Sequence, residues 1–336
     1  AVAIEAFVGS TVDSELSGNM IDICPVGALT SKPFRYSART WELSRRKSVA
    51  AHDSSGANLV VQVKGQKVMR VVPFENDQVN ECWISDRDRF SYEALNSAER
   101  LTSPMIKQDG QWQSVDWETA LQYVAHAVKD ITAKAGAQSI GALVSPHNTV
   151  EELFLARHLI NGLGSDNIDY RLRNAQFSAS TGAKWLGRSI ASLSNLDRAL
   201  VVGSNLRKDH PLFALRVRQA TRKGAQVSSI NSAVELAKPD AWALNVAQSI
   251  SANATDWYQA LANVAAAIAT EKSLTAPAQG TADATSQAIA KSLLTGKEKA
   301  ILLGNAAAHH ADAANLLVLA SWIAEQTGAS VGYLTE

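Results

Sequence analysis

From about residue 139 onward, short apolar runs alternate with helical patterns, and this alternation constrains the fold more than any other feature. The apolar runs are SIGALVS (139–145), DRALVVGSN (197–205), AQVSSINS (225–232) and KAILLGN (299–305). Helical patterns separate them, for example at 149–164 and at 211–224, where Pro211 suits the first turn. Strands that alternate with helices predict a doubly wound parallel sheet, with ligand crevices at the carboxyl ends of its strands.

The residues before this region predict two hairpins and a long helix. Gly65 separates the apolar runs 58–63 and 67–72, and Asp109-Gly110 marks a second turn. A helix is expected from Trp117 to about Gly136, capped by Asp116. The stretch 275–287, TAPAQGTADATSQ, has the composition of a surface insertion or linker. We therefore expect an α/β protein in which a small β-rich region precedes the parallel-sheet body.

Composition excludes several classes of function. The 336 residues exceed what one core usually organises, so two or three domains are expected. Because 32 basic residues balance 32 acidic ones, nucleic acid is not an expected partner. The most apolar late segment, 315–324, is too short to cross a bilayer, so no direct membrane insertion is expected. Two cysteines cannot build a disulfide framework.

One of these cysteines, Cys24, stands directly before Pro25 in IDICPVGALT. In bacterial ferredoxin-type sequences the last cysteine of the ligand run precedes a proline, but a [4Fe-4S] cluster needs four cysteines and Cys82 is the only other one here. Two interpretations stay open. In the first, Cys24 is a small structural side chain. In the second, its three partner ligands lie before Ala1; the first residues of the sequence suggest a cut chain, which is consistent with this.

The run SELSGNMIDICPVGALTSKPFRYSARTWEL (14–43) closely resembles the large iron–sulfur subunit of respiratory NADH:quinone oxidoreductase, complex I. This resemblance implies that Cys24 is the fourth ligand of a [4Fe-4S] cluster, whose other three ligands form an upstream C-x2-C-x2-C. Segments 86–107, 167–173 and 185–227 also resemble that subunit, more weakly beyond about Ala233. Its body is similar to the molybdopterin-dependent oxidoreductases, which implies a parallel-sheet body of the molybdopterin-oxidoreductase type.

The resemblance implies three domains. Residues 1–46 would be the tail end of a ferredoxin-like iron–sulfur domain, and 104–336 an α/β domain like the molybdopterin oxidoreductase body. Residues 47–103 would be a β-rich domain that resembles the 4Fe-4S domain of molybdopterin oxidoreductases with its cysteines lost. The four positions of that domain's cysteine pattern hold Ala50, Asp53, Ala57 and Ser85. No cluster is expected there, and Cys82 is interpreted as structural.

Two further patterns contain residues of ligand type. The loop VVGSN (201–205) resembles a phosphate-approach loop, but the third strand lacks the acidic or arginine pair that would grip a nucleotide, so no molybdopterin is expected. His309, His310 and Asp312 have ligand chemistry, yet neighbouring residues on a helix point in different directions. We interpret this group as a surface cluster, and Arg45-Arg46-Lys47 as a solvated or inter-subunit charge cluster.

The resemblance implies an electron-transfer subunit of complex I, acting from NADH to quinone, with the α/β body as scaffold and the chain inactive alone. Its partners would be other peripheral-arm subunits, including the flavin-bearing one. It would lie peripherally on the cytoplasmic face of the bacterial inner membrane, or on the mitochondrial matrix side. The alternatives are a molybdopterin-dependent oxidoreductase and a cofactor-free interaction module of the same fold.

Overall fold

The computed structural model describes residues 12–170, 184–232 and 243–335. Its contacts divide the chain into two compact units, Ala1–Tyr92 with Arg173–Glu336 (unit 1) and Glu93–Leu172 (unit 2). The expected domain boundaries after residues 46 and 103 separate segments that resemble different family domains. A grouping by contacts does not test such boundaries, so they stay predictions. Part of the expected ferredoxin-like tail and the residues just after the third expected strand lie outside the described residues.

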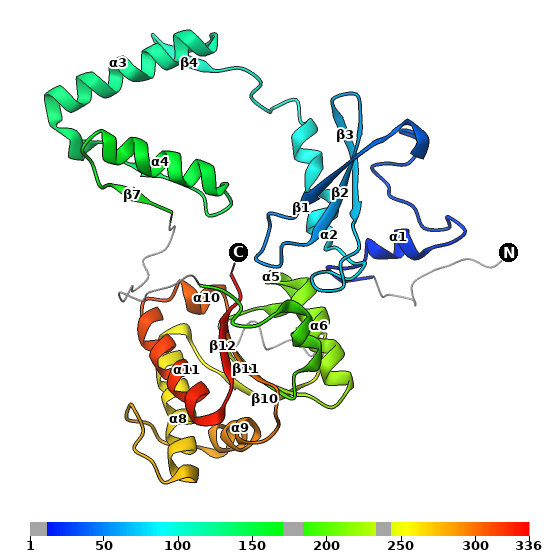
Figure 1. Ribbon diagram of the computed structural model, residues 1–336, viewed down its shortest axis with the longest axis vertical. Coiled ribbons are helices and arrows are strands. Elements are labelled where there is room, and N and C mark those ends of the chain that lie inside the picture. Colours follow the sequence, from blue (N-terminus) through cyan, green and yellow to red (C-terminus); the bar gives the residue numbers. More distant parts are fainter. Residues whose placement is uncertain (1–11, 171–183, 233–242, 336) are drawn as a thin grey trace. The chain divides into compact units, whose positions relative to one another are not determined.

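The body of unit 1 is a five-stranded, fully parallel sheet, which confirms the expected α/β class (Figure 1). Its strands run in the order β10-β9-β8-β11-β12. They are β8 (Arg198–Val202), β9 (Gln226–Asn231), β10 (Val246–Ser251), β11 (Lys299–Leu303) and β12 (Ser330–Tyr333). The sequence predicted the three central strands but not the edges β10 and β12, because edge strands are less apolar than central ones.

Helices cover both faces of this sheet because successive strand residues point to opposite sides. Leu200 and Val202 of β8 share a core with α8, α9 and α11, whereas Ala199 and Val201 pack with α6 and η4. Figure 1 shows α6 on one side of the sheet and α8 and α11 on the other. The bounds are η4 (Ile190–Asn195), α5 (Leu206–Asp209), α6 (Pro211–Arg222), η5 (Ala254–Asp256), α8 (Trp257–Lys272), α9 (Ala284–Leu294), α10 (Asn305–Ala308) and α11 (Ala313–Thr327).

Two sequence-based expectations need correction. The stretch 275–287 is not all linker, since α9 begins at Ala284, where the carboxylate of Asp283 accepts a hydrogen bond from the Ser286 N–H at 2.7 Å. An aspartate N-cap satisfies a free amide at the helix start, which outweighs the loop-like composition. The apolar run 139–145 contributes only β6 (Ala142–Leu143), which pairs with β7 (Ile168–Asp169) and lies outside the five-stranded sheet.

A three-stranded antiparallel sheet forms the β-rich part of unit 1. It contains β1 (Ser44–Val49), β2 (Asn58–Lys64) and β3 (Lys67–Pro73), with Gly65 at φ +62° in the β2–β3 turn. Its core includes Ile84, Leu59 and also Leu212 of α6, so the β-rich part and the α/β body share buried contacts. Short helices accompany it: α1 (Asn19–Ile23), η1 (Thr40–Glu42), α2 (Asp86–Phe90) and η2 (Ser91–Asn96).

Unit 2 contains the hairpin β4 (Met105–Gln108) and β5 (Gln111–Ser114), then α3 (Trp117–Ala135), η3 (Ala137–Ser139), β6, α4 (Val150–Gly162) and β7. As predicted, Asp116 caps α3 by accepting a hydrogen bond from the Thr119 N–H at 2.7 Å. Large apolar side chains on both helices are exposed, among them Leu121 and Phe154. In the described part of the chain, no helix has the length and apolar character required to span a bilayer.

Candidate cluster-binding site

Cys24 ends helix α1 in unit 1 and is half-buried. The chain turns immediately after it, with Gly27 at φ +66°, a backbone conformation that favours glycine. The turn brings the Leu29 N–H to 3.5 Å from the Cys24 Sγ, where it donates a hydrogen bond. The small residues that follow Cys24 therefore place backbone amides around its sulfur.

These amides favour the charged form of the Cys24 thiol. The N–H of Leu29 lowers the pKa of the thiol below its ordinary value, with further help from the N–H groups of Ala28, Val26 and Gly27, while partial burial opposes them. A hydrogen bond to the charged form favours that form, and the thiolate is the form that binds metals. By contrast, desolvation and nearby carboxylates, including that of Glu81, raise the pKa of exposed Cys82. Of the two cysteines, Cys24 is the one whose surroundings favour the thiolate.

The structure brings the four positions of the lost cysteine pattern into a closed region. Ala50 and Ala57 are buried in the β-rich core, and the Ala50 N–H donates a hydrogen bond to the Ala57 carbonyl at 2.8 Å. Asp53 and Ser85 are also buried. Methyl groups, a carboxylate and a hydroxyl do not offer the four thiolates that a [4Fe-4S] cluster needs. The residues present at this second position therefore do not fit a cluster.

A hydrogen-bonded polar network fills the surroundings of this second position. Asp88, which is 3% exposed, accepts a hydrogen bond from the Ser85 hydroxyl at 2.8 Å and contacts His52 Nδ1 at 3.0 Å. Burial raises the pKa of Asp88, the Ser85 hydroxyl opposes this, and the nearby Asp53 carboxylate adds to it. Asp53 itself accepts hydrogen bonds from Ser55 and pairs with Arg87. The carboxylates of Asp88 and Asp53 are therefore held by hydrogen bonds and ion pairs with neighbouring side chains.

The crevice that a doubly wound sheet offers lies between β8 and β11, where the strand order reverses. Gly203 and Gly304 follow these two strands, and both are tightly packed. A Cβ on Gly203 would come within 2.7 Å of the Ala307 nitrogen, and a Cβ on Gly304 within 2.3 Å of the Ser204 Cβ. The backbone at this switch point is therefore in contact with protein atoms.

The polar groups at the switch point have the wrong charge for a pyrophosphate. The Asp209 carboxylate accepts a hydrogen bond from the Asn205 N–H at 2.9 Å, at the amide that a phosphate would use. Among the described residues, two buried amide oxygens, Asn205 Oδ1 and Asn231 Oδ1, have no hydrogen-bond partner, and such acceptors repel phosphate oxygens. This arrangement does not fit a molybdopterin cofactor.

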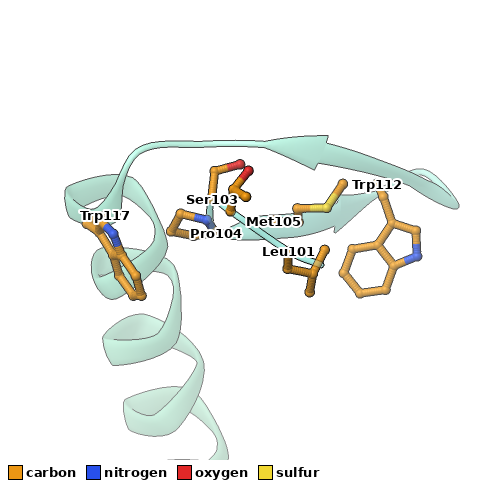
Figure 2. Close-up of a pocket in the computed structure, with 7 residues that line it drawn as sticks. Leu101, Ser103, Pro104, Met105, Trp112 and Trp117 are labelled. Atoms are coloured by element: carbon orange, nitrogen blue, oxygen red, sulfur yellow. The ribbon is translucent and has the colours of Figure 1, made fainter. Parts of the chain in front are cut away.

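Two other features carry no evident chemistry. A pocket of about 580 Å³ in unit 2 is lined by Leu101, Thr102, Ser103, Pro104, Met105, Trp112 and Trp117, and no titratable side chain lines it. Figure 2 shows the indoles of Trp112 and Trp117 at its two ends.

His310 binds the Ala254 carbonyl through Nε2 and the Asp312 N–H through Nδ1. Within the described ranges, no three His, Cys, Asp or Glu side chains gather as a metal site.

Three family models match the chain. Residues 100–332 match the model described as molybdopterin oxidoreductase. Residues 43–93 match "NADH-ubiquinone oxidoreductase NDSU1/NuoG-like, 4Fe-4S domain", and residues 1–30 match "NADH-quinone oxidoreductase subunit 3, ferredoxin-like domain". The resemblance stated from the sequence is confirmed by these matches and by the relatives that follow.

Curated relatives are named as NADH-quinone or NADH-ubiquinone oxidoreductase subunits. The chain is 38% identical over 223 residues to an NADH-quinone oxidoreductase subunit of Rickettsia felis, covering 66% of this chain and 32% of the relative. It is 35% identical to the NADH-ubiquinone oxidoreductase 75 kDa subunit of Reclinomonas americana, covering 66% and 33%. The chain thus matches about a third of each relative's length.

A solved structure, acetylene hydratase from Pelobacter acetylenicus, superposes with a TM-score of 0.52 at 15% identity, over 85% of this chain and 40% of that one. At this level of identity the likeness concerns the fold.

Proposed function

We propose that this chain, which belongs to the molybdopterin oxidoreductase family, is part of an electron-transfer subunit of NADH:quinone oxidoreductase and does not perform molybdopterin catalysis. The observation that carries this proposal is the Cys24 sulfur within its group of backbone amides. The ferredoxin-like match over residues 1–30 includes this cysteine. The residues of the α/β crevice, which do not suit a pyrophosphate, weigh against the molybdopterin alternative.

In this proposal Cys24 is one of four ligands of a [4Fe-4S] cluster. The other three come from polypeptide outside these 336 residues, since Cys82 is the only other cysteine and lies in a different setting. When bound, the cluster accepts and releases one electron at a time. The chain's own part is to supply the Cys24 thiolate and to hold the Leu29 amide against its sulfur. The parallel-sheet body serves as scaffold.

The proposal extends to domains, partners and location. Residues 1–46, 47–103 and 104–336 would derive from the ferredoxin-like tail, the former cluster domain and the molybdopterin oxidoreductase body. The partners would be other complex I subunits, including the flavin-bearing one, at the cytoplasmic face of the bacterial inner membrane or the matrix side in mitochondria. Support comes from β1, whose six residues, including Arg45-Arg46-Lys47, are all exposed and available to another subunit.

The test replaces each cysteine in turn in the full-length subunit of the assembled enzyme. We expect Cys24→Ala to remove one [4Fe-4S] signal from the electron paramagnetic resonance spectrum and to abolish electron flow to quinone. The matched control, Cys82→Ala, should leave every signal in place. If all the signals persist in Cys24→Ala, Cys24 is a structural residue. This result would support the alternative that the chain is a cofactor-free interaction module.

Elemental analysis of the same preparation tests the other alternative. Stoichiometric molybdenum or tungsten would contradict the proposal and support a molybdopterin-dependent enzyme.

A further inference from the structure

Helix α2 starts at the last position of the lost cysteine pattern. Ser85 stands at that position and caps the helix, because its hydroxyl oxygen accepts a hydrogen bond from the Asp88 N–H at 3.1 Å. The five residues of α2 are DRDRF, so four consecutive side chains are charged. A single helical turn has little stability of its own, and its contacts must hold it in place.

The charged side chains of α2 contact two different segments of the chain. Arg87 pairs with Asp53 at 3.1 Å and Asp88 contacts His52 at 3.0 Å, so these two residues hold the loop around the former cluster position. Asp86 instead binds the segment that leads to Cys24. Its carboxylate accepts hydrogen bonds from the Gly18 N–H at 2.7 Å and from the Ser17 hydroxyl at 2.5 Å.

Arg89 makes the direct connection to helix α1. Its side chain is 5% exposed and pairs with Asp22 at 2.5 Å. The same guanidinium donates a hydrogen bond to the Asn19 side-chain oxygen at 3.0 Å. Asn19 is itself fixed, since its amide nitrogen donates to the Ile84 carbonyl at 2.7 Å and its oxygen accepts from the Ile84 N–H at 3.1 Å.

Gly18 leaves room for the Arg89 side chain because it has no Cβ. A Cβ on Gly18 would lie 2.7 Å from the Arg89 Cδ and 2.8 Å from its Nε, so a side chain there would displace the guanidinium. The pair is half-buried, because the Arg89 side chain is 5% exposed and the Asp22 side chain 30% exposed. Among the described residues the buried Arg89 Nε has no hydrogen-bond partner, so Arg89 is held through its other guanidinium nitrogens. Removing Arg89 leaves the Asp22 carboxylate without this cation. Asp22 lies in this short helix, two residues before Cys24, which caps the helix end. The Arg89–Asp22 pair therefore limits how α1 can rotate.

We propose that Arg89 is a positioning residue for Cys24: through Asp22 and Asn19 it fixes helix α1 and so holds the sulfur against the amides of residues 26–29. The inference rests on the proposed function, because it assigns Arg89 a task in holding a cluster ligand. Helix α2 thereby ties the α1 segment to the region in which the second cluster position has been lost.

The first experiment measures a reduction potential in the assembled enzyme. Arg89→Gln leaves the Asp22 carboxylate without its cation and loosens the sulfur–amide contacts, and both changes favour the oxidised cluster. We expect a lower midpoint potential for the cluster whose signal Cys24→Ala removes, with Arg89→Lys restoring part of the shift. Arg87→Gln is the matched control on the same helix, and its potential should equal that of the wild type. An unchanged potential in Arg89→Gln would overturn the inference.

The second experiment uses the 336-residue chain and needs no cluster. Hydrogen exchange of the Leu29 and Gly27 amides, which both hydrogen-bond to Cys24, should be about tenfold faster in Arg89→Gln, because α1 has lost a hydrogen bond to a charged group, and unchanged in Arg87→Gln. Asp22→Asn breaks the same pair from its more exposed side and should give the same increase, so the test does not depend on one variant folding. Equal exchange in all variants would contradict the positioning role.

The two proposals can fail separately. If Cys24→Ala retains every signal while Arg89→Gln speeds the exchange, the cluster proposal fails and the helix anchor stands. If Cys24→Ala loses its signal and neither the exchange nor the potential responds to Arg89→Gln, the positioning role fails alone.

Discussion

Replacing Gly203 with alanine tests whether the switch-point crevice is filled by protein. Gly203 has φ +64°, and the new Cβ would lie 2.7 Å from both the Ala307 nitrogen and the Trp257 Cζ3. The left-handed backbone costs an alanine about 1 kcal/mol, and overpacking in a close-packed interior adds about 1–3 kcal/mol. We therefore expect Gly203→Ala to lower the free energy of unfolding by about 2–4 kcal/mol.

Gly328 supplies the matched control in the same unit. Its φ is +72°, and a Cβ there would have no heavy atom of the described residues within 4 Å. Gly328→Ala should therefore lose only the backbone contribution of about 1 kcal/mol. The difference between the two variants isolates the packing contribution, about 1–3 kcal/mol.

Thermal unfolding followed by far-ultraviolet circular dichroism measures this difference. For units of this size each kcal/mol corresponds to about 2–4 °C in Tm, so Gly203→Ala should melt several degrees below Gly328→Ala. Equal melting temperatures would mean that Ala307 and Trp257 move aside at little cost. The crevice would then be able to open for a ligand, and the argument against a pterin at this position would be refuted.

Three further predictions concern the cysteines and Asp88. Because the chain offers one thiolate at the proposed cluster, the purified 336 residues should hold no stoichiometric iron and acid-labile sulfide; an intact four-iron content would contradict the ligand assignment. Iodoacetamide should modify Cys24 faster than Cys82 near neutral pH, since the pKa of the first is lowered and that of the second raised, and mass spectrometry of timed samples measures both rates. The raised pKa of Asp88 means that the folded state keeps a proton which the unfolded state loses, so its contribution to stability is lost as pH rises. Urea unfolding should show Asp88→Asn gaining stability relative to the wild type from about pH 4 to about pH 7; a constant difference would refute this.

Some of the candidate site could be predicted from the sequence. Cys24, its proline and the small residues behind it are adjacent, so the turn that places amides at the sulfur is a local property of the chain. The misfit of the second position to a cluster was equally visible, because no rearrangement of Ala50, Asp53, Ala57 and Ser85 creates thiolates. Such conclusions depend on residue chemistry and on spacing along a few residues.

Contacts between distant segments could not be predicted in this way. Arg89 and Asp22 are separated by 67 positions, and nothing in either neighbourhood indicates the other. The position of Asp209 at the Asn205 amide likewise depends on how a short helix follows β8.

The sequence by itself determined the parallel α/β class, the N-cap at Asp116, and the cysteine of the proposed cluster. These properties follow from hydrophobic periodicity and from hydrogen bonds that span three or four residues. Only the tertiary structure decided that Gly203 and Gly304 pack against protein atoms at the switch point, that a polar network surrounds Asp53 and Ser85, and that Arg89 anchors the helix that precedes Cys24. Burial and charge pairing depend on which distant side chains fold together, and no local pattern encodes that.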